Sequence, residues 1–216
     1  MRLAELSDVS GVSPASIKFY LREGLLDAGE RVNSTRASYG EQHVRRLRLI
    51  TGLRSVVGLG LPEVRRIIEA AVGADDLPGR RLALLGTVQS VVLRLGDEQP
   101  DASPAVDALL RDLDWPDAPS EARSAVDRHL AEMEAAGVPV DRTTLAVYGR
   151  AADLVADVQL SETDARAELE DFILMAAVGL HMHQRLILTI LGLAQASHSI
   201  RRYGPGDHAG PGPGRP

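Results

Sequence analysis

Few side chains in this sequence have the types and spacing that catalysis or metal binding requires. Cysteine is absent, which excludes disulfides, thiolate metal ligands and cysteine nucleophiles. His181 and His183 are two residues apart, so on a helix they point to different faces, whereas helical metal pairs are three or four residues apart. His129 and Glu132 have that spacing but stand alone. We therefore predict no metal and no cofactor.

Motifs for catalysis are also missing. Neither a nucleophile elbow nor a phosphate-binding loop occurs in the sequence. The acidic cluster of Glu168, Glu170 and Asp171 is typical of a solvated helix face. We therefore expect a protein that is not an enzyme.

The distribution of charge is more informative. The 216 residues carry 24 basic and 30 acidic side chains, a net charge of −6, and an acidic average disfavours a phosphate backbone as partner. Residues 1–70 nevertheless have a net charge of +3, and residues 71–216 have −9. This partition indicates a nucleic-acid-facing module joined to an acidic domain.

The elements that must position the basic residues begin with two short helices. The first ends at Gly11, and Ser13 followed by Pro14 marks the start of the second, which ends at Gly24. Two short helices joined by a tight turn make a helix-turn-helix. The polar segment 27–39 then predicts a two-stranded hairpin, or wing.

Helical periodicity returns at Glu41. The helix that starts there has the inner stripe Val44, Leu47, Ile50, Leu53 and Val57. Pro62 opens another helix, with the inner residues Val64, Ile67, Ile68 and Ala71. A helix at Arg80–Leu95 has the heptad spacing of a dimerisation seam at Leu85, Val88, Val92 and Leu95. Packing of this seam within its own chain is the alternative.

Three more helices are predicted after a proline-rich boundary. They span Ser120–Ala136, Asp141–Leu160 and Glu162–Arg202, with a break or kink near Gly179 in the last. The middle helix is apolar on two stripes, so we expect it to be largely buried. From residue 204 onward glycine and proline dominate, which predicts a disordered tail.

One apolar stretch, Phe172 to Ala194, is long enough to cross a bilayer. Polar and charged residues at its centre, Arg185 among them, favour a buried helix in a soluble protein instead. The first ten residues are charged and lack the apolar region of a signal peptide. We expect a cytoplasmic protein with no membrane partner.

Together these elements predict a mainly α protein in four parts. Residues 1–72 form a winged helix-turn-helix with a small β-hairpin wing, and residues 79–97 form a dimerisation helix. Residues 101–203 form an all-helical C-terminal effector or interaction domain, and residues 204–216 form the disordered Gly/Pro tail.

The run from Ser16 to Leu26, Ser-Ile-Lys-Phe-Tyr-Leu-Arg-Glu-Gly-Leu-Leu, resembles the recognition-helix signature of the MerR family of transcription regulators. That family typically reads Thr-Ile-Arg-Tyr-Tyr-Glu-x-x-Gly-Leu-Leu here. The flanking residues agree in order over about 70 positions. The sequence departs from the pattern at Lys18, where the family has Arg, and at Phe19, where it has Tyr. Lys18 lacks the planar guanidinium that makes bidentate contacts with guanine.

The resemblance implies a homodimer on a pseudo-palindrome in double-stranded promoter DNA, which it bends and untwists so that RNA polymerase engages both promoter elements. A helix in the major groove needs short polar or basic side chains near its N-terminus, and flanking residues contact phosphates. The expected DNA-binding residues are Ser13, Ser16, Lys18, Tyr20, Arg22, Arg31, Asn33, Ser34, Arg36, Tyr39, Arg45 and Arg46. For the last two arginines, a solvated helix face is the alternative.

The C-terminal domain leaves its role open. An apolar pocket for a small organic effector would be lined by Trp115, Tyr148, Phe172, Met175, His181 and Met182. The same residues fit a plain hydrophobic core that only extends dimerisation. The alternative from another functional class is an effector-independent architectural co-regulator whose helical C-terminal domain docks another protein. The MerR regulators that sense metals or redox state use cysteines. This sequence has none, so we expect that it senses neither.

Overall fold

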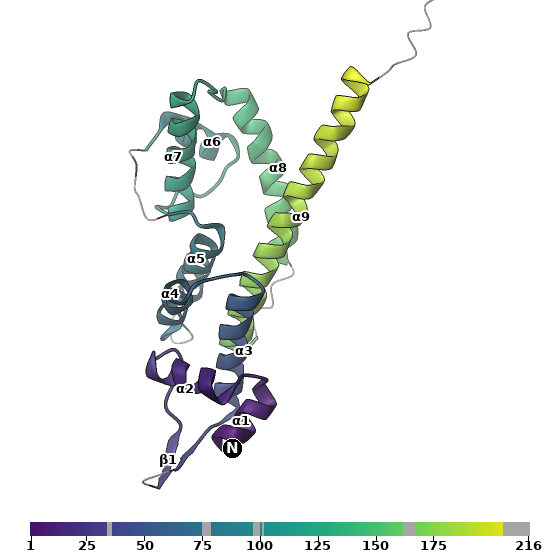
Figure 1. Cartoon of the computed structure of the whole chain (residues 1–216). Helices are drawn as coiled ribbons and strands as arrows, with labels where there is room; N and C mark the ends of the chain where they lie inside the picture. Colours follow the sequence, from purple (N-terminus) through teal and green to yellow (C-terminus); the bar gives the residue numbers. More distant parts are fainter. Residues whose placement is uncertain (34–35, 75–78, 97–99, 101, 162–166, 205–216) are drawn as a thin grey trace, which may run out of the picture. The chain divides into compact units, whose positions relative to one another are not determined.

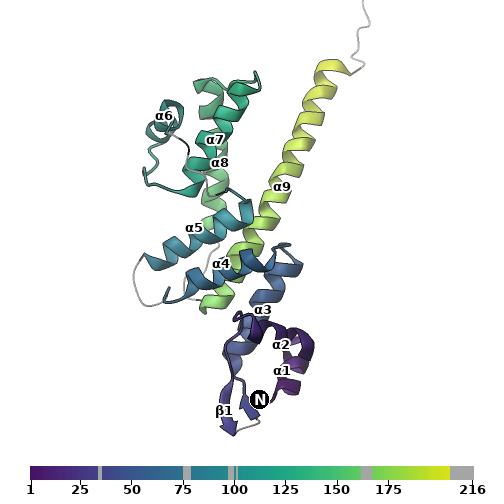
Figure 2. The same ribbon diagram turned by 60° about the vertical axis from the view of Figure 1, so that its left-hand side comes forward.

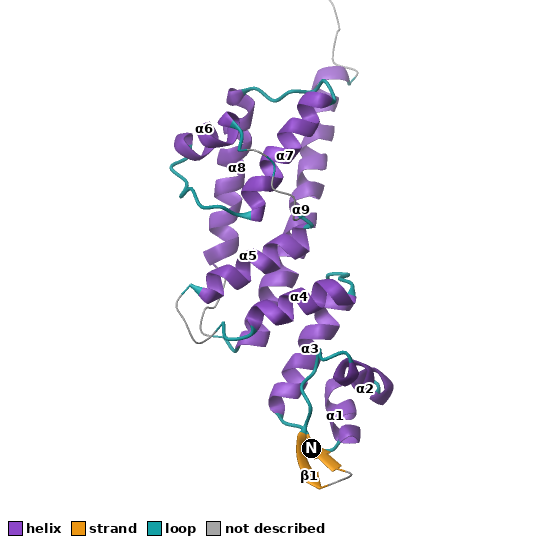
Figure 3. Cartoon of the chain, turned by 90° about the vertical axis from the view of Figure 1, so that its left-hand side faces the viewer, coloured by secondary structure: helices purple, strands orange, loops and turns teal. Residues whose placement is uncertain are grey.

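The computed structural model describes the whole chain except residues 34–35, 75–78, 97–99, 101, 162–166 and 205–216. Its described part is mainly helical, with one two-stranded sheet (Figure 3). By internal contacts the chain divides into two units, Met1–His181 and the residues from Met182 onward. The predicted boundaries at 72, 79, 97 and 101 lie inside the first unit. The predicted tail beyond Gly204 lies outside the described residues.

The helix-turn-helix is confirmed and consists of α1 (Leu3–Ser10) and α2 (Pro14–Arg22) (Figure 1). Gly11 ends α1 in the left-handed conformation, with φ of 69°, which glycine adopts without a steric penalty. Ser13 caps α2, because its hydroxyl oxygen accepts a hydrogen bond from the Ser16 amide at 3.1 Å. The turn therefore follows directly from the local sequence.

The wing is also confirmed. Strand β1 (Glu30–Asn33) pairs antiparallel with β2 (Arg36–Ser38), with an irregularity in the register of β1. Next to it, the Met1 amino group donates to the Tyr39 carbonyl oxygen at 2.7 Å, and the Tyr39 amide donates to the Met1 carbonyl oxygen at 2.9 Å. These two bonds tie the chain's first residue to the base of the wing. The predicted turn residue Ser34 lies outside the described residues.

Helices α3 (Glu41–Ser55) and α4 (Leu61–Ala71) supply the core under the helix-turn-helix. Every residue of their two predicted inner stripes is buried, and Leu47, Ile50 and Leu53 are fully so. Leu6 of α1 and Ile17 of α2 belong to the same core. The period of the apolar residues therefore predicts which side of each helix faces inward.

Helix α5 (Arg80–Leu93) packs against α4, and its inner face belongs to the same core. Val88 and Val92 of the predicted dimerisation seam are buried within their own chain, whereas Leu85 and Leu95 are half-buried. Leu84 and Val91, outside the predicted seam, are buried as well. This burial favours packing within the chain, because two of the four seam residues are not available to a second copy.

Helices α6 (Pro104–Asp112), α7 (Glu121–Ala135) and α8 (Arg142–Ser161) follow. The prediction that α8 is largely buried is wrong, since Tyr148 and Leu154 are more than half exposed. The physical reason is that, in the described part of the chain, only α6 packs extensively against α8. An apolar stripe shows that one face of a helix is hydrophobic. It does not show whether another element covers that face.

The end of α6 is tied to the start of α8 by an ion pair. The Arg142 guanidinium donates to the two carboxylate oxygens of Asp112 at 2.9 and 2.6 Å. These bonds hold the pKa of the Asp112 carboxyl below its usual value. Both side chains lie at the surface, so the pair fixes geometry more than it stabilises the fold.

Helix α9 (Leu169–Tyr203) is one uninterrupted helix (Figure 2), so the predicted break at Gly179 is wrong. Its start is in the core, where Phe172, Ile173 and Ala177 are buried. The prediction of a buried helix holds only for this start. By length and composition α9 could span a membrane, and 11% of its most apolar segment is buried.

The leucine pair on α5 tests whether this helix is packed within its own chain. Leu84 is 1% exposed and Leu82 is 74% exposed. We expect Leu84→Ala to lower the free energy of unfolding by about 3 kcal/mol, because it leaves a cavity in the core. The matched control, Leu82→Ala, should change it by less than about 0.5 kcal/mol.

Urea denaturation of the full chain measures both values. The Leu84→Ala loss should not depend on protein concentration, because both sides of the contact belong to one chain. Equal losses for the two variants, or a Leu84→Ala loss that disappears at high protein concentration, would contradict this packing.

Candidate nucleic-acid interface

Helix α2 presents one exposed row of side chains. Ile17 and Tyr20 are buried on its inner side, which leaves Ala15, Lys18 and Arg22 exposed on the other. These three residues are three and four positions apart, so they lie on the same face of the helix. The row combines one small side chain near the N-terminus of α2 with two cations further along.

The start of α2 carries two serine hydroxyls. The Ser13 hydroxyl is 2.9 Å from the Ser16 hydroxyl, so the two are hydrogen-bonded to each other, and the Ser13 hydroxyl oxygen also accepts from the Ser16 amide. Ser13 is exposed and Ser16 is half-buried. Both predicted residues therefore lie at the N-terminal end of the exposed row.

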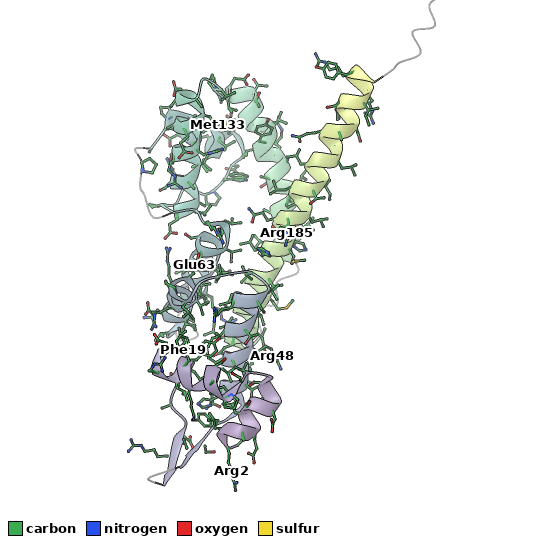
Figure 4. All side chains as sticks on the ribbon, viewed as in Figure 1. Arg2, Phe19, Arg48, Glu63, Met133 and Arg185 are labelled. Carbon is green, nitrogen blue, oxygen red and sulfur yellow. The ribbon has the colours of Figure 1, made fainter. Side chains whose placement is uncertain are left out.

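Arg22 is held over an aromatic ring. Its guanidinium carbon lies 5.3 Å from the centre of the Phe19 ring, a cation–π distance. The Arg22 side chain is nevertheless 71% exposed, and its Nε lies 3.7 Å from the Glu23 carboxylate. Phe19, labelled in Figure 4, thus positions Arg22 without needing the hydroxyl that the family's tyrosine carries.

Two predicted contact residues are buried instead of exposed. The Tyr20 ring is in the core, and its hydroxyl accepts a hydrogen bond from Arg54 at 3.4 Å. The Tyr39 ring is buried edge-on against His43, with ring centres 5.2 Å apart. Both tyrosines were predicted to contact DNA. In the structure their rings are buried and pack beneath the exposed row. Their aromatic area makes the core the more stable location.

The wing contributes one described cation. Arg31 on β1 is exposed. The backbones of Asn33 and Arg36 lie in the two strands, but their side chains, like Ser34, are outside what the structure describes. Arg31 is therefore the wing residue whose side chain can be placed at the proposed interface.

Three arginines of α3 have acidic partners at the start of α9. Arg45 pairs with Glu168, the residue before α9, at 3.7 Å, Arg46 with Glu170 at 3.2 Å and Arg48 with Asp171 at 3.9 Å. The acidic cluster was interpreted as a solvated helix face, which is wrong for the largely buried Glu170, whereas the Glu168 and Asp171 side chains are 68% and 41% exposed although each lies beside an arginine. No sequence signal pairs these segments, which are more than 120 residues apart.

The three pairs differ in exposure. The Arg46 and Glu170 side chains are 19% and 17% exposed, whereas those of Arg48 and Asp171 are 62% and 41% exposed. Arg46 donates from both Nε and Nη2 to the same carboxylate oxygen of Glu170. Arg46 is therefore a structural residue of the α3–α9 contact.

Arg65 of α4 contacts the C-terminal end of α2. It was not among the predicted site residues. Its guanidinium donates to the Glu23 carbonyl oxygen at 2.7 Å and lies 3.6 Å from the Glu23 carboxylate. The bond satisfies a backbone carbonyl at the C-terminus of α2. The residue type carried no signal, because arginine is the usual cation throughout this chain.

The predicted effector residues of the first unit have different surroundings. The Trp115 indole donates to Asp153 at 2.7 Å, Phe172 is in the main core beneath Arg81, and Met175 is exposed. A cavity of about 600 Å³ lies elsewhere in the first unit, lined by Pro62, Glu63, Arg66, Ser90, Val91, Arg94 and Gly96. Among the residues that the structure describes, no cluster of three or more His, Asp or Glu could hold a metal ion.

Comparison with known proteins supports the reading of the N-terminal module. Residues 1–71 match the family model described as MerR HTH family regulatory protein. The nodulation protein NolA of Bradyrhizobium elkanii is 32% identical over 81 residues, which cover 38% of this chain and 36% of that protein. NolA of Bradyrhizobium sp. (strain NC92) is 31% identical over a similar segment. The chain thus matches only about a third of the length of these curated relatives.

A solved structure is similar over nearly the whole chain. The candidate transcriptional regulator SCO5550 from Streptomyces coelicolor A3(2) is 34% identical, with a TM-score of 0.61. The alignment covers 94% of this chain and 98% of that one, so it includes the helices that follow the N-terminal module. On these grounds the chain belongs to the MerR family of helix-turn-helix regulatory proteins.

Proposed function

We propose that this regulator binds promoter DNA as a homodimer, with the exposed row of α2 in the major groove and the wing on the adjacent backbone. The observation that carries the proposal is the exposed pair Lys18 and Arg22, on a helix whose opposite face is fixed in the core. A recognition helix docks in this way, with its N-terminal residues at the base edges.

The proposed roles follow from side-chain length and charge. Ser13, Ala15 and Ser16 are short and lie at the N-terminus of α2, where base edges come closest. Lys18 supplies a point charge, which suits a phosphate better than a bidentate contact with guanine. Arg22 and Arg31 extend the contact to flanking phosphates, which position the protein without reading sequence. Asn33, Ser34 and Arg36 complete the proposed wing contact.

A second copy is needed for useful affinity. The module's net charge of +3 is modest, and each phosphate contact adds to the electrostatic part of the binding free energy. Two modules on a pseudo-palindrome would double those contacts and allow the DNA to be bent and untwisted between them. RNA polymerase would then respond to the altered promoter geometry, in the cytoplasm and without any enzymatic step by this chain.

Control of the regulator has two candidate forms. A small organic effector would bind in the helical C-terminal region. Docking of another protein onto that region is favoured by one observation, because Tyr148, Leu154 and Met175 expose large apolar side chains. Titration of candidate metabolites against Trp115 fluorescence distinguishes the two forms. A saturable change supports an effector, and no change across a broad panel supports docking.

Replacement of Lys18 tests the proposed contact. We expect Lys18→Ala to weaken binding to the DNA upstream of the protein's own gene and to reduce the salt slope by roughly one for each Lys18 that contacts a phosphate. Gel shifts at several salt concentrations measure the slope. The control is Arg111→Ala, which removes an exposed cation on α6 and should leave the slope unchanged. An unchanged slope in Lys18→Ala would show that this residue does not contact DNA.

Replacement of Arg46 tests whether it supports the fold instead of the DNA. Arg46→Ala and Glu170→Ala should each lower the free energy of unfolding by about 2 kcal/mol, because each leaves a largely buried charge unpaired. The double variant should lose less than the sum of the two. Arg48→Ala, from the exposed pair, is the control and should cost less than about 0.5 kcal/mol.

The DNA affinity of folded Arg46→Ala should remain within about twofold of wild type, as expected when no interaction with DNA is lost. A large loss of affinity with unchanged stability would instead place Arg46 on the DNA.

A further inference from the structure

The N-terminal tip of α2 presents apolar groups. Pro14 and Ala15 are the first two residues of the helix, and both are exposed. Ala15 begins the exposed row that continues with Lys18 and Arg22, so its methyl group lies on the same side of α2 as the two cations. A methyl group neither donates nor accepts a hydrogen bond. Any group that Ala15 recognises through its side chain must therefore be apolar as well.

The polar groups of the same turn are bonded within the protein. The Ser13 hydroxyl oxygen accepts from the Ser16 amide at 3.1 Å, and the two serine hydroxyls are 2.9 Å apart. The Ser13 carbonyl oxygen accepts from the Ile17 amide at 2.9 Å, and Pro14 has no amide hydrogen. In the described part of the chain, Ala15 is thus the one residue of this first turn whose amide hydrogen has no partner.

A phosphate group fits this tip poorly. Phosphate binding at the start of a helix uses several free backbone amides, whereas the capping by Ser13 leaves one. The first cation of the row is Lys18, three residues beyond Ala15. Contacts with phosphates are therefore expected further along α2, and the tip itself is suited to a base edge.

The apolar group on the major-groove edge of a base is the C5-methyl group of thymine. The other groups on that edge are hydrogen-bond donors and acceptors, and a contact of alanine with this methyl group is one way in which proteins read thymine. Such a contact removes apolar surface from water and involves no charge. Its contribution to affinity should therefore not depend on salt, unlike that of a phosphate contact.

We propose that Ala15 is a specificity-determining residue that contacts the C5-methyl group of a thymine in each half-site. This inference rests on the proposed function, because it requires α2 in the major groove, and it names the base that the row selects. Lys18 and Arg22 then contribute affinity through phosphates, and sequence preference arises at the short, apolar end of the row.

Replacement of single thymines by deoxyuridine tests the contact, because it removes the methyl group and keeps the base pair. The DNA is the segment protected upstream of the protein's own gene, or a duplex selected from a random library. We expect one thymine position in each half-site at which the change weakens binding roughly threefold to fivefold. Gel shifts at two salt concentrations should give the same loss.

The variant Ala15→Gly shows whether Ala15 reads that methyl group. It should bind the thymine duplex more weakly and no longer distinguish thymine from deoxyuridine at that position, because the methyl group has lost its partner. Glycine also weakens the start of the helix, but that cost is the same on both duplexes. The matched control is Ala4→Gly, at the exposed second residue of α1, which should keep the full deoxyuridine loss.

Methylated cytosine carries the same C5-methyl group, and a third set of duplexes distinguishes it from thymine. These duplexes carry 5-methyldeoxycytidine at single cytosine positions. If methylated cytosine is the partner, no deoxyuridine position matters, and one 5-methyldeoxycytidine raises the affinity of the wild-type chain but not of Ala15→Gly. That result would overturn the assignment of thymine.

The remaining outcomes separate this inference from the proposed function. A deoxyuridine loss that Ala15→Gly retains would mean that another residue reads the methyl group, and the inference would be wrong. Indifference to every substitution of a pyrimidine methyl group, with binding that Lys18→Ala weakens, would refute the role of Ala15 and retain the proposed function. A chain without saturable binding to its upstream DNA or to any selected duplex would refute both.

Discussion

The contact of the start of α9 with α3 is the constraint on which the rest of the structure depends. Ile173 and Ala177 of α9 are fully buried in the same core that holds Ile17 beneath the recognition helix. Leu174 lies directly over Gly52 of α3, where any Cβ would collide with it. The N-terminal module and the start of α9 thus share one hydrophobic core, to which Ile17 of α2 also belongs.

This contact also divides the arginines by role. Arg45, Arg46 and Arg48 of α3 pair with carboxylates at the start of α9, whereas Lys18 and Arg22 of α2 and Arg31 of the wing are exposed. The chain's net charge of −6 is therefore a poor guide to its partner. Part of the acidity pairs with arginines of α3, and Lys18, Arg22 and Arg31 are exposed where a recognition helix and wing would meet DNA.

The N-terminal module could be predicted from sequence because its signals are local. Ser13-Pro14 and Gly11 determine where helices start and end, and the stripe of α3 identifies its buried side without further information. What covers an apolar face could not be predicted in the same way. The seam on α5 and the stripes on α8 are apolar in either case, and periodicity does not say whether the chain's own helices or a partner buries them.

The candidate site follows the same rule. The exposure of Lys18 and Arg22 could be predicted because the helical period separates exposed from buried positions within α2. The role of Tyr20 was not, since an aromatic residue with a hydroxyl suits both a core and a phosphate contact. The pairing of Arg46 with Glu170 depends on the packing of α9 against α3, which are more than 120 residues apart in the sequence. No local sequence pattern predicts that packing.

Hydroxyl-radical footprinting of the full chain on the DNA upstream of its own gene would test whether α2 binds DNA. We predict two segments of protected sugars related by a pseudo-twofold axis, each of which loses protection beside the contacted groove in Lys18→Ala. Protection that is absent, or that is unaffected by this substitution while the protein remains folded, would contradict the assignment of the exposed row on α2 as the DNA-binding surface.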